Sequence, residues 1–201
     1  MLESLDKLDK EIFLFFNSLH ADWLDPIMWA ITESGTWIPF YVLIIAFLVY
    51  KFRWNTIFIL MAIGLTITLA DQFASGFCKP FFERLRPSHS PELEGLVHLI
   101  QDKNGNYYKG GSFGFISSHS ANTFGLASFL FCLFRKRVAY ISLMFLWAAI
   151  VSYSRIYVGV HYPGDLMVGA LTGILWGFLS FKLLMFLWNK FAPQKSLYYQ
   201  K

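Results

Sequence analysis

Three long runs of residues without a charged side chain constrain this chain more than any other feature. They are TWIPFYVLIIAFLVY (36–50), WNTIFILMAIGLTITLA (54–70) and VAYISLMFLWAAIVSYS (138–154). A helix of roughly 20 apolar residues crosses about 30 Å of hydrocarbon, so each run approaches or reaches the length of a membrane span. Only 15% of the residues are charged, against about a quarter in an ordinary soluble protein. The sequence therefore predicts an all-α, multi-pass bundle of transmembrane helices.

The apolar runs predict five spanning helices with a shorter N-terminal segment before them. The spans are expected at 36–50, 55–78, 115–134, 138–156 and 163–189. Residues 5–19 carry apolar side chains at helical spacing but are too few to span, so 1–35 is predicted to be an interfacial or re-entrant segment. Within it, 22–34 either extends the first span or forms a separate half-helix, and a sixth span is the alternative. We expect one integral-membrane domain over residues 1–201.

The charged residues divide between the two sides of this topology. Lys and Arg collect at 51–54, at 135–137 and in a tail at 190–201, and none of these segments contains Asp or Glu. Because cytoplasmic loops accumulate Lys and Arg, we place these segments in the cytoplasm and the loop 79–114 outside. The net charge of +4 then follows from the topology and requires no nucleic-acid partner.

The exterior loop 79–114 is long for a compact protein, and such loops are commonly functional or disordered. An Asn-Gly pair at 104–105 lies between residues of fair strand propensity, which favours a hairpin. The loop is either a lid over a site or a spacer between two spans.

Three polar clusters stand at helix ends that this topology places on the outer face. They are KPFFERLRP (79–87), ISSHSAN (116–122) and SRIYVGVHYPGD (154–165). If Lys79, Arg86 and Arg155 converge on the first turn of the third span, their charges and the free N–H groups of the helix make a strong anion site. Phosphate is the ligand that fits such a site.

Two of the five histidines, His119 and His161, stand beside these cations. Asp165 follows His161 by four residues, and Pro163 indicates a helix start, so the carboxylate is expected within reach of the imidazole. A carboxylate there fixes the tautomer and stabilises the imidazolium form. One histidine can then attack phosphorus while the other protonates the departing oxygen. The sequence near the site has neither the carboxylate cluster that suits Mg²⁺ nor a close ligand set for zinc, so no metal is expected.

These clusters resemble the signature of the type 2 phosphatidic acid phosphatase family, membrane lipid phosphatases related to vanadium haloperoxidases. The family pattern is Lys, six residues, Arg-Pro; then Pro-Ser-Gly-His; then Ser-Arg, five residues, His, three residues, Asp. The first and third motifs match without departure, at Lys79, Arg86, Pro87, Ser154, Arg155, His161 and Asp165. In the middle motif Ser117 and His119 match, but Ile116 stands in place of proline and Ser118 in place of glycine.

The resemblance implies that His161 is a nucleophile that forms a phosphohistidine, and that Asp165 orients it. It implies that His119 is the general acid for the leaving group and then the base for water. It also implies that the phosphate oxygens are bound by Lys79, Arg86, Arg155, Ser117 and the backbone N–H of Ser118. The implied reaction is hydrolysis of a lipid phosphate or diphosphate at the outer face of the membrane, without a metal or cofactor.

The family suggests four classes of substrate: undecaprenyl diphosphate, phosphatidylglycerol phosphate, phosphatidic acid and the phosphates of lipid A. The sequence does not distinguish between them. The expected location is the bacterial cytoplasmic membrane, with the site facing the periplasm or exterior, and the oligomeric state stays open. One alternative is a non-catalytic protein that binds or transports anionic lipids, which leaves the His161–Asp165 pair without a role. Another is a lipid phosphotransferase on the same fold.

Two further predictions come from spacing alone. Asp71, Ser75 and Lys79 are four residues apart, so they share one face of the second span; Asp71 is either a partner for a basic residue or a packing group. In the last span, a small-residue stripe at Gly169, Gly173 and Gly177 favours close helix packing.

Overall fold

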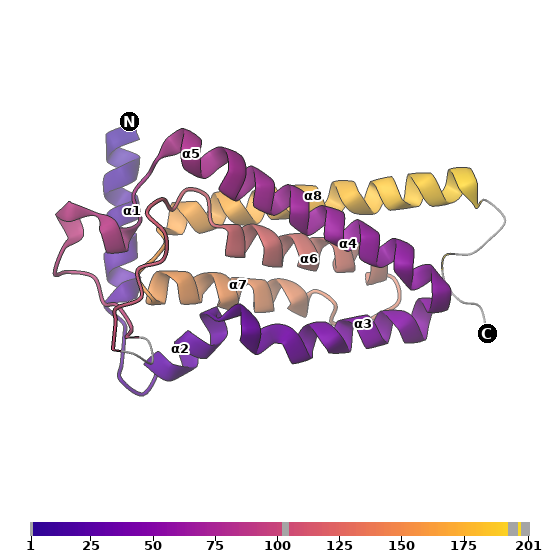
Figure 1. The fold of residues 1–201 in the computed structure, drawn as a ribbon, viewed down its shortest axis with the longest axis horizontal. Helices are drawn as coiled ribbons and strands as arrows, with labels where there is room; N and C mark the ends of the chain where they lie inside the picture. Colours follow the sequence, from indigo (N-terminus) through magenta and orange to yellow (C-terminus); the bar gives the residue numbers. More distant parts are fainter. Residues whose placement is uncertain (1, 102–104, 193–196, 198–201) are drawn as a thin grey trace.

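The computed structural model describes residues 2–101, 105–192 and 197. Long helices run side by side along the molecule, and α1 lies across one end of them (Figure 1). The helices are α1 (Leu2–Asn17), α2 (Asp25–Thr32), α3 (Ile38–Phe52), α4 (Thr56–Asp71), α5 (Lys79–Phe82), α6 (Ser118–Phe134), α7 (Leu143–Tyr157) and α8 (Pro163–Phe191). A π-helical segment, Gln72–Cys78, joins α4 to α5. The prediction of an all-helical fold is confirmed for the described residues.

Two segments, Ser34–Phe82 and Pro163–Phe191, are long and apolar enough to cross a membrane, and Leu143–Tyr157 is a shorter apolar helix. Large apolar side chains cover the outer surface of these helices; Met61 is 68% exposed and Leu171 is 66% exposed. Such surfaces are stable against lipid tails and costly in water. The segments predicted to span are helical, as α3, α4 with its continuation into α5, α6, α7 and α8, and the number that cross the membrane stays a prediction.

The structure decides between the two alternatives for residues 22–34 in favour of a separate short helix, and it corrects two predicted helix starts. Residues 22–34 do not extend the first span, because the chain leaves α2 at Glu33 in an extended conformation and forms a separate 3-10 turn before α3. The third span begins at Ser118 instead of 115, because Ser117 is extended and caps the helix. The fourth begins at Leu143 instead of 138, because Tyr140 has a positive φ of 62° that breaks the helical path.

The close pairing of α6 with α8 forms the centre of the bundle. The glycine stripe of α8 faces α6 so closely that a Cβ on Gly173 would overlap the backbone carbonyl of Ala121. A Cβ on Gly169 would lie 2.7 Å from the carbonyl oxygen of Ser117. The packing role predicted for the stripe is confirmed, and it holds the first turns of both helices against each other.

Helix α1 is amphipathic, as predicted for residues 5–19. Its inward face buries Phe13 and Asn17, and the Asn17 side chain donates to the carbonyl oxygens of Ile156 and Tyr157. Its outward face exposes large apolar side chains, including Leu8 and Phe15. Because α1 lies across the end of the bundle (Figure 1), this apolar face suits the interface of a bilayer.

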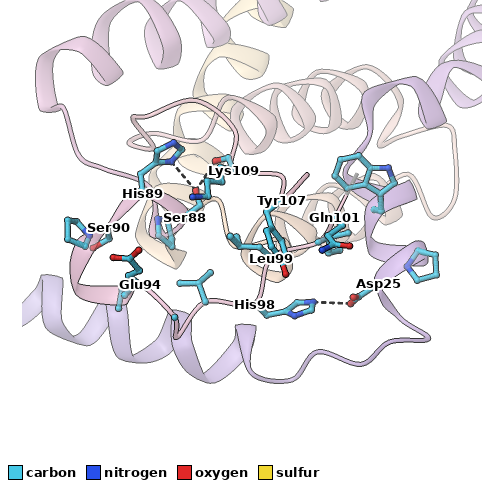
Figure 2. A pocket seen from close by; sticks show the side chains of 18 residues that line it. Asp25, Ser88, His89, Ser90, Glu94, His98, Leu99, Gln101, Tyr107 and Lys109 are labelled. Carbon is cyan, nitrogen blue, oxygen red and sulfur yellow. Dashed lines mark hydrogen bonds and ion pairs between the residues drawn. The ribbon is translucent and has the colours of Figure 1, made fainter. Parts of the chain in front are cut away.

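Residues of the loop 79–114 line a cavity of about 1080 Å³ together with the start of α2. Figure 2 shows Ser88 and His89 beside Lys109 at one end of this cavity. At the other end the His98 ring is hydrogen-bonded to Asp25. None of the eight candidate site residues lines this cavity. The predicted hairpin is reduced to an isolated antiparallel bridge between Gln101 and Tyr107, and residues 102–104 lie outside the described residues.

Candidate active site

The three polar clusters meet at the end of the bundle that α1 covers. Lys79 begins α5, Arg86 follows in the loop, His119 lies in the first turn of α6, and Arg155 and His161 flank the end of α7. The His119 ring lies close enough to four side chains for their charges to act on it: Lys79, Arg86, Arg155 and His161. Segments more than 80 residues apart along the sequence thus lie together around His119.

His161 is 1% exposed and is fixed through its Nδ1 atom. This atom lies 3.3 Å from Oδ2 of Asp165, which also accepts a hydrogen bond of 3.1 Å from the backbone N–H of Tyr162. Gly114 adds a backbone hydrogen bond to the same ring. With Nδ1 occupied, Nε2 is the ring nitrogen left for a ligand.

Burial and the nearby cations govern the charge of His161. Burial is the largest cause, followed by Arg86, Arg155 and Lys79, and together they lower the pKa of His161 well below its usual 6.5. The ring is therefore neutral at physiological pH in the free protein. A neutral imidazole has a lone pair on Nε2, as a nucleophile requires.

Two buried arginines hold unpartnered N–H groups in this site. Arg86 donates from Nε to the carbonyl of Phe113 at 3.1 Å, but its buried Nη1 has no hydrogen-bond partner. Arg155 donates to the hydroxyls of Thr32 (2.7 Å) and Tyr108 (3.1 Å), while its buried Nε has none. Buried donors without partners are costly, so these atoms indicate an oxyanion ligand.

Lys79 is positioned by hydroxyl groups. Its Nζ donates to Ser118 at 2.7 Å and to Ser75 at 3.1 Å, and Ser75 in turn donates to Asp71 at 3.3 Å. The predicted face of Asp71, Ser75 and Lys79 is confirmed. Asp71 is linked to the cation through Ser75, which agrees with the reading of Asp71 as a partner for a basic residue.

The first turn of α6 departs in one respect from the predicted arrangement. The backbone N–H of Ser117 donates to the carbonyl of Asp165, and the Ser117 side chain accepts from the N–H of Ser120 as the helix cap. The hydroxyl hydrogen of Ser117 is therefore its remaining donor for a phosphate oxygen. Ser118 contributes a side chain as well as the predicted N–H, because its hydroxyl accepts from Lys79.

His119 opens onto a second cavity of about 460 Å³ between α3, α4, α6 and α7. Ser118, His119 and Asp71 line its polar end. Further along the same helices the lining is apolar, with Ile44, Ile45, Leu60, Ile63, Ile67 and Leu126. The cavity leads from the cationic site into the part of the bundle that the lipid-facing helices surround.

Sequence reasoning missed four contributors to the site. Thr32 and Tyr108 hold Arg155, and Gly114 lies against His161 and Arg86, where a Cβ would come within 3.2 Å of the Arg86 side chain. The fourth is Arg84, which stands within the first polar cluster and whose guanidinium lies 2.9 Å from Asp165. No motif marks these residues, because their roles depend on tertiary contacts.

Among the described residues, no three His, Cys, Asp or Glu side chains are grouped so that they could hold a metal ion. The metal-free mechanism stays a prediction that chelation tests.

Comparison with known proteins identifies the family of the chain. The model of the PAP2 superfamily matches residues 59–189. A lipid A 4'-phosphatase of Bacteroides thetaiotaomicron is 45% identical over 90% of this chain and 79% of its own, and one of Porphyromonas gingivalis is 33% identical over 92% and 76%. The crystal structure of Aquifex aeolicus LpxE is 27% identical, with a TM-score of 0.60 over 87% of this chain and 95% of its own.

A solved PAP2-type phosphatidylglycerolphosphate phosphatase from Bacillus subtilis, described as transmembrane, shares the fold at 24% identity, with a TM-score of 0.63 over 96% of this chain and 90% of its own. The family match covers both histidines and all three cations of the site. The chain therefore belongs to the PAP2 superfamily and is an integral membrane enzyme of the phosphatase class.

Proposed function

We propose that this protein hydrolyses the phosphate monoester of a membrane lipid through a phosphohistidine, with lipid A as the first candidate substrate. The observation that carries the proposal is the buried His161–Asp165 pair beside two arginines with unpartnered N–H groups. The relatives that are 45% and 33% identical are both named lipid A 4'-phosphatase, and their names support lipid A as the first substrate to test.

The geometry supports the following first step. Nε2 of neutral His161 attacks phosphorus as the bond from phosphorus to the lipid oxygen breaks. His119, which takes up a proton when the phosphate dianion binds beside it, gives that proton to the lipid oxygen. Asp165 holds the Nδ1 proton and stabilises the positive ring that forms. Lys79, Arg86 and Arg155 stabilise the charge on the three phosphate oxygens that take no part in bond breaking.

Water then completes the reaction. His119, now neutral, takes a proton from a water molecule that attacks phosphorus, the bond to Nε2 breaks, and inorganic phosphate leaves. Both histidines thus return to their starting charge. Ser117 and the N–H of Ser118, at the start of α6, add donors to the same oxygens.

The 460 Å³ cavity supports a lipid as the substrate. Its polar end includes His119 and its apolar part lies within the bundle, so an acyl chain can stay in hydrocarbon while its phosphate reaches the site. We place the site at the outer face of a five-span bacterial inner-membrane protein. The charge distribution supports this, because Lys51, Arg53 and the cluster at 135–137 lie at helix ends opposite the site, and cytoplasmic ends collect such residues.

The decisive experiment measures phosphate release by detergent-purified protein in excess EDTA. The substrates are lipid A, phosphatidylglycerol phosphate, phosphatidic acid and undecaprenyl diphosphate. We expect release with chelator present, greatest from lipid A, and none from His161→Ala. Loss of all turnover with EDTA would exclude the metal-free mechanism. Binding of these lipids without any release would favour the anionic-lipid binder.

A further inference from the structure

Arg84, in the loop after α5, contacts three carboxylates from two distant parts of the chain. Its Nη1 atom lies 2.9 Å from Oδ1 of Asp165 and 2.9 Å from Oδ2 of Asp9, and its Nη2 atom lies 2.9 Å from Oδ1 of Asp6. Its guanidinium also lies over the ring of Tyr162, 4.1 Å from the centroid. Asp6 and Asp9 belong to α1, so this one side chain joins the N-terminal helix to the first turn of α8.

The Asp165 carboxylate has a different partner on each oxygen. Oδ1 accepts from Arg84, while Oδ2 faces Nδ1 of His161 and accepts from the N–H of Tyr162. Its side chain is fully buried. A buried carboxylate without a cation tends to take up a proton, and a neighbouring guanidinium keeps it charged. Arg84 therefore governs both the charge and the orientation of the group that holds His161.

The contacts of Arg84 separate it from the phosphate-binding cations. Asp165, Asp9 and Asp6 raise the pKa of Arg84, although burial alone would lower it. Three carboxylates around one guanidinium leave no excess positive charge to attract an anion. Arg86 and Arg155 differ, because each keeps a buried N–H group without a partner.

We propose that Arg84 is a positioning residue, which acts through Asp165 to hold His161 in line for attack and which α1 anchors through Asp6 and Asp9. Helix α1 is then part of the catalytic apparatus as well as an interfacial helix. The backbone adds to this anchor, because the N–H of Gly164 donates to Oδ1 of Asp9 at 2.7 Å. The inference rests on the proposed function for its meaning in catalysis, but binding measurements test it without turnover.

The test compares two anions on wild type, Arg84→Gln and Arg84→Lys by titration calorimetry in detergent. The Kd of inorganic phosphate measures how well the cations bind an anion. Vanadate forms a five-coordinate adduct with the nucleophile, so its Kd depends also on the orientation of His161. In Arg84→Gln we expect the Kd of vanadate to rise about tenfold or more and the Kd of phosphate to stay within about twofold. The kcat should fall about a hundredfold, as misplacement of a reacting group does, and Arg84→Lys should recover part of both losses.

Two further variants make the result specific. Arg86→Gln should weaken phosphate and vanadate alike. Lys10→Gln removes the ion pairs of Lys10 with Asp6 (2.8 Å) and Glu92 (2.6 Å) without touching Asp165, so it should bind both anions as wild type does. Asp9→Asn, which keeps an oxygen for Gly164, should weaken vanadate by an intermediate amount and serves if Arg84→Gln does not fold.

Equal loss of phosphate and vanadate binding in Arg84→Gln would make Arg84 a phosphate ligand and overturn the inference. Unchanged vanadate binding and kcat would overturn it as well. If wild type binds both anions but releases phosphate from no lipid, the proposed function fails, while the two-anion comparison still decides the role of Arg84.

Discussion

Lys79 donates a hydrogen bond of 2.7 Å to the hydroxyl of Ser118, the residue that stands where the family pattern has glycine. The same hydroxyl lies 3.0 Å from that of Ser75. A position that gives only a backbone N–H in the family pattern therefore also holds a cation here. The hydroxyl lies between α5 and the first turn of α6, and it aims the Lys79 ammonium into the site.

Replacing Ser118 with alanine should weaken phosphate binding without disturbing the fold. The ammonium loses one fixed acceptor, and a hydrogen bond of this kind contributes about 1 kcal/mol, so the Kd of inorganic phosphate should rise about fivefold. Titration calorimetry measures it. Ser88→Ala, whose hydroxyl donates to the carbonyl of Lys109 away from the site, is the matched control. A Kd equal to that of wild type would show that Ser75 alone positions Lys79.

The lowered pKa of His161 gives the stability of the protein a pH dependence. Between pH 6.5 and that lower pKa, the unfolded chain binds a proton that the folded chain does not, so the free energy of unfolding falls as the pH falls. The slope for one such group is at most about 1.4 kcal/mol per pH unit. The contribution is present above pH 6.5 and is lost toward acid.

When the pH is lowered from 7 to 5, the Tm of His161→Gln should therefore fall less than the Tm of wild type. Melting followed by tryptophan fluorescence in one detergent compares the two proteins. His20→Gln, at an exposed histidine away from the site, controls for removal of an imidazole. If wild type and His161→Gln show the same drop in Tm, burial does not suppress the charge of His161.

The contact between His161 and Asp165 can be predicted from the sequence because it is local. The spacing of four between His161 and Asp165, with Pro163 at the helix start, already puts the carboxylate within reach of the ring. The spans are predictable as well, because an apolar run needs only its length to cross a bilayer.

The contacts that sequence reasoning missed are those that join distant segments. Thr32 and Arg155 are 123 residues apart, and no spacing rule connects them. The link from Asp9 to Arg84 likewise depends on how α1 lies across the bundle. Helix starts were predicted too early at 115 and 138, because hydropathy does not register the cap at Ser117 or the positive φ of Tyr140.

The contact between α6 and α8 should be sensitive to a single methyl group. A Cβ at Gly173 would overlap the Ala121 carbonyl and lie 2.9 Å from the N atom of Gly125, and overpacking of this kind costs about 1–3 kcal/mol. Gly173→Ala should lower the Tm measured in detergent. At Gly64 no atom lies within 4 Å of the added Cβ, so Gly64→Ala should leave the Tm unchanged or raise it by helix propensity. If Gly173→Ala and Gly64→Ala changed the Tm equally, α6 and α8 would not pack at this distance.

The cavity beside His119 should determine how well the enzyme uses lipids. Ile67 lines it, whereas Met61 on the same helix is 68% exposed on the outer surface. Ile67→Trp fills the space that an acyl chain needs. If two methylene groups of the acyl chain lose their contacts, the binding free energy falls by about 1.6 kcal/mol, so the KM for lipid A should rise about fifteenfold.

A small ester separates this effect from damage to the active site. The rate with p-nitrophenyl phosphate, which has no acyl chain, should stay within about twofold of wild type in Ile67→Trp, because its phosphate occupies the cationic site alone. Met61→Trp should behave as wild type with both substrates, since its side chain faces outward. If Ile67→Trp slowed both substrates equally, the cavity would be a structural void. If it slowed neither, the acyl chain would lie elsewhere on the bundle.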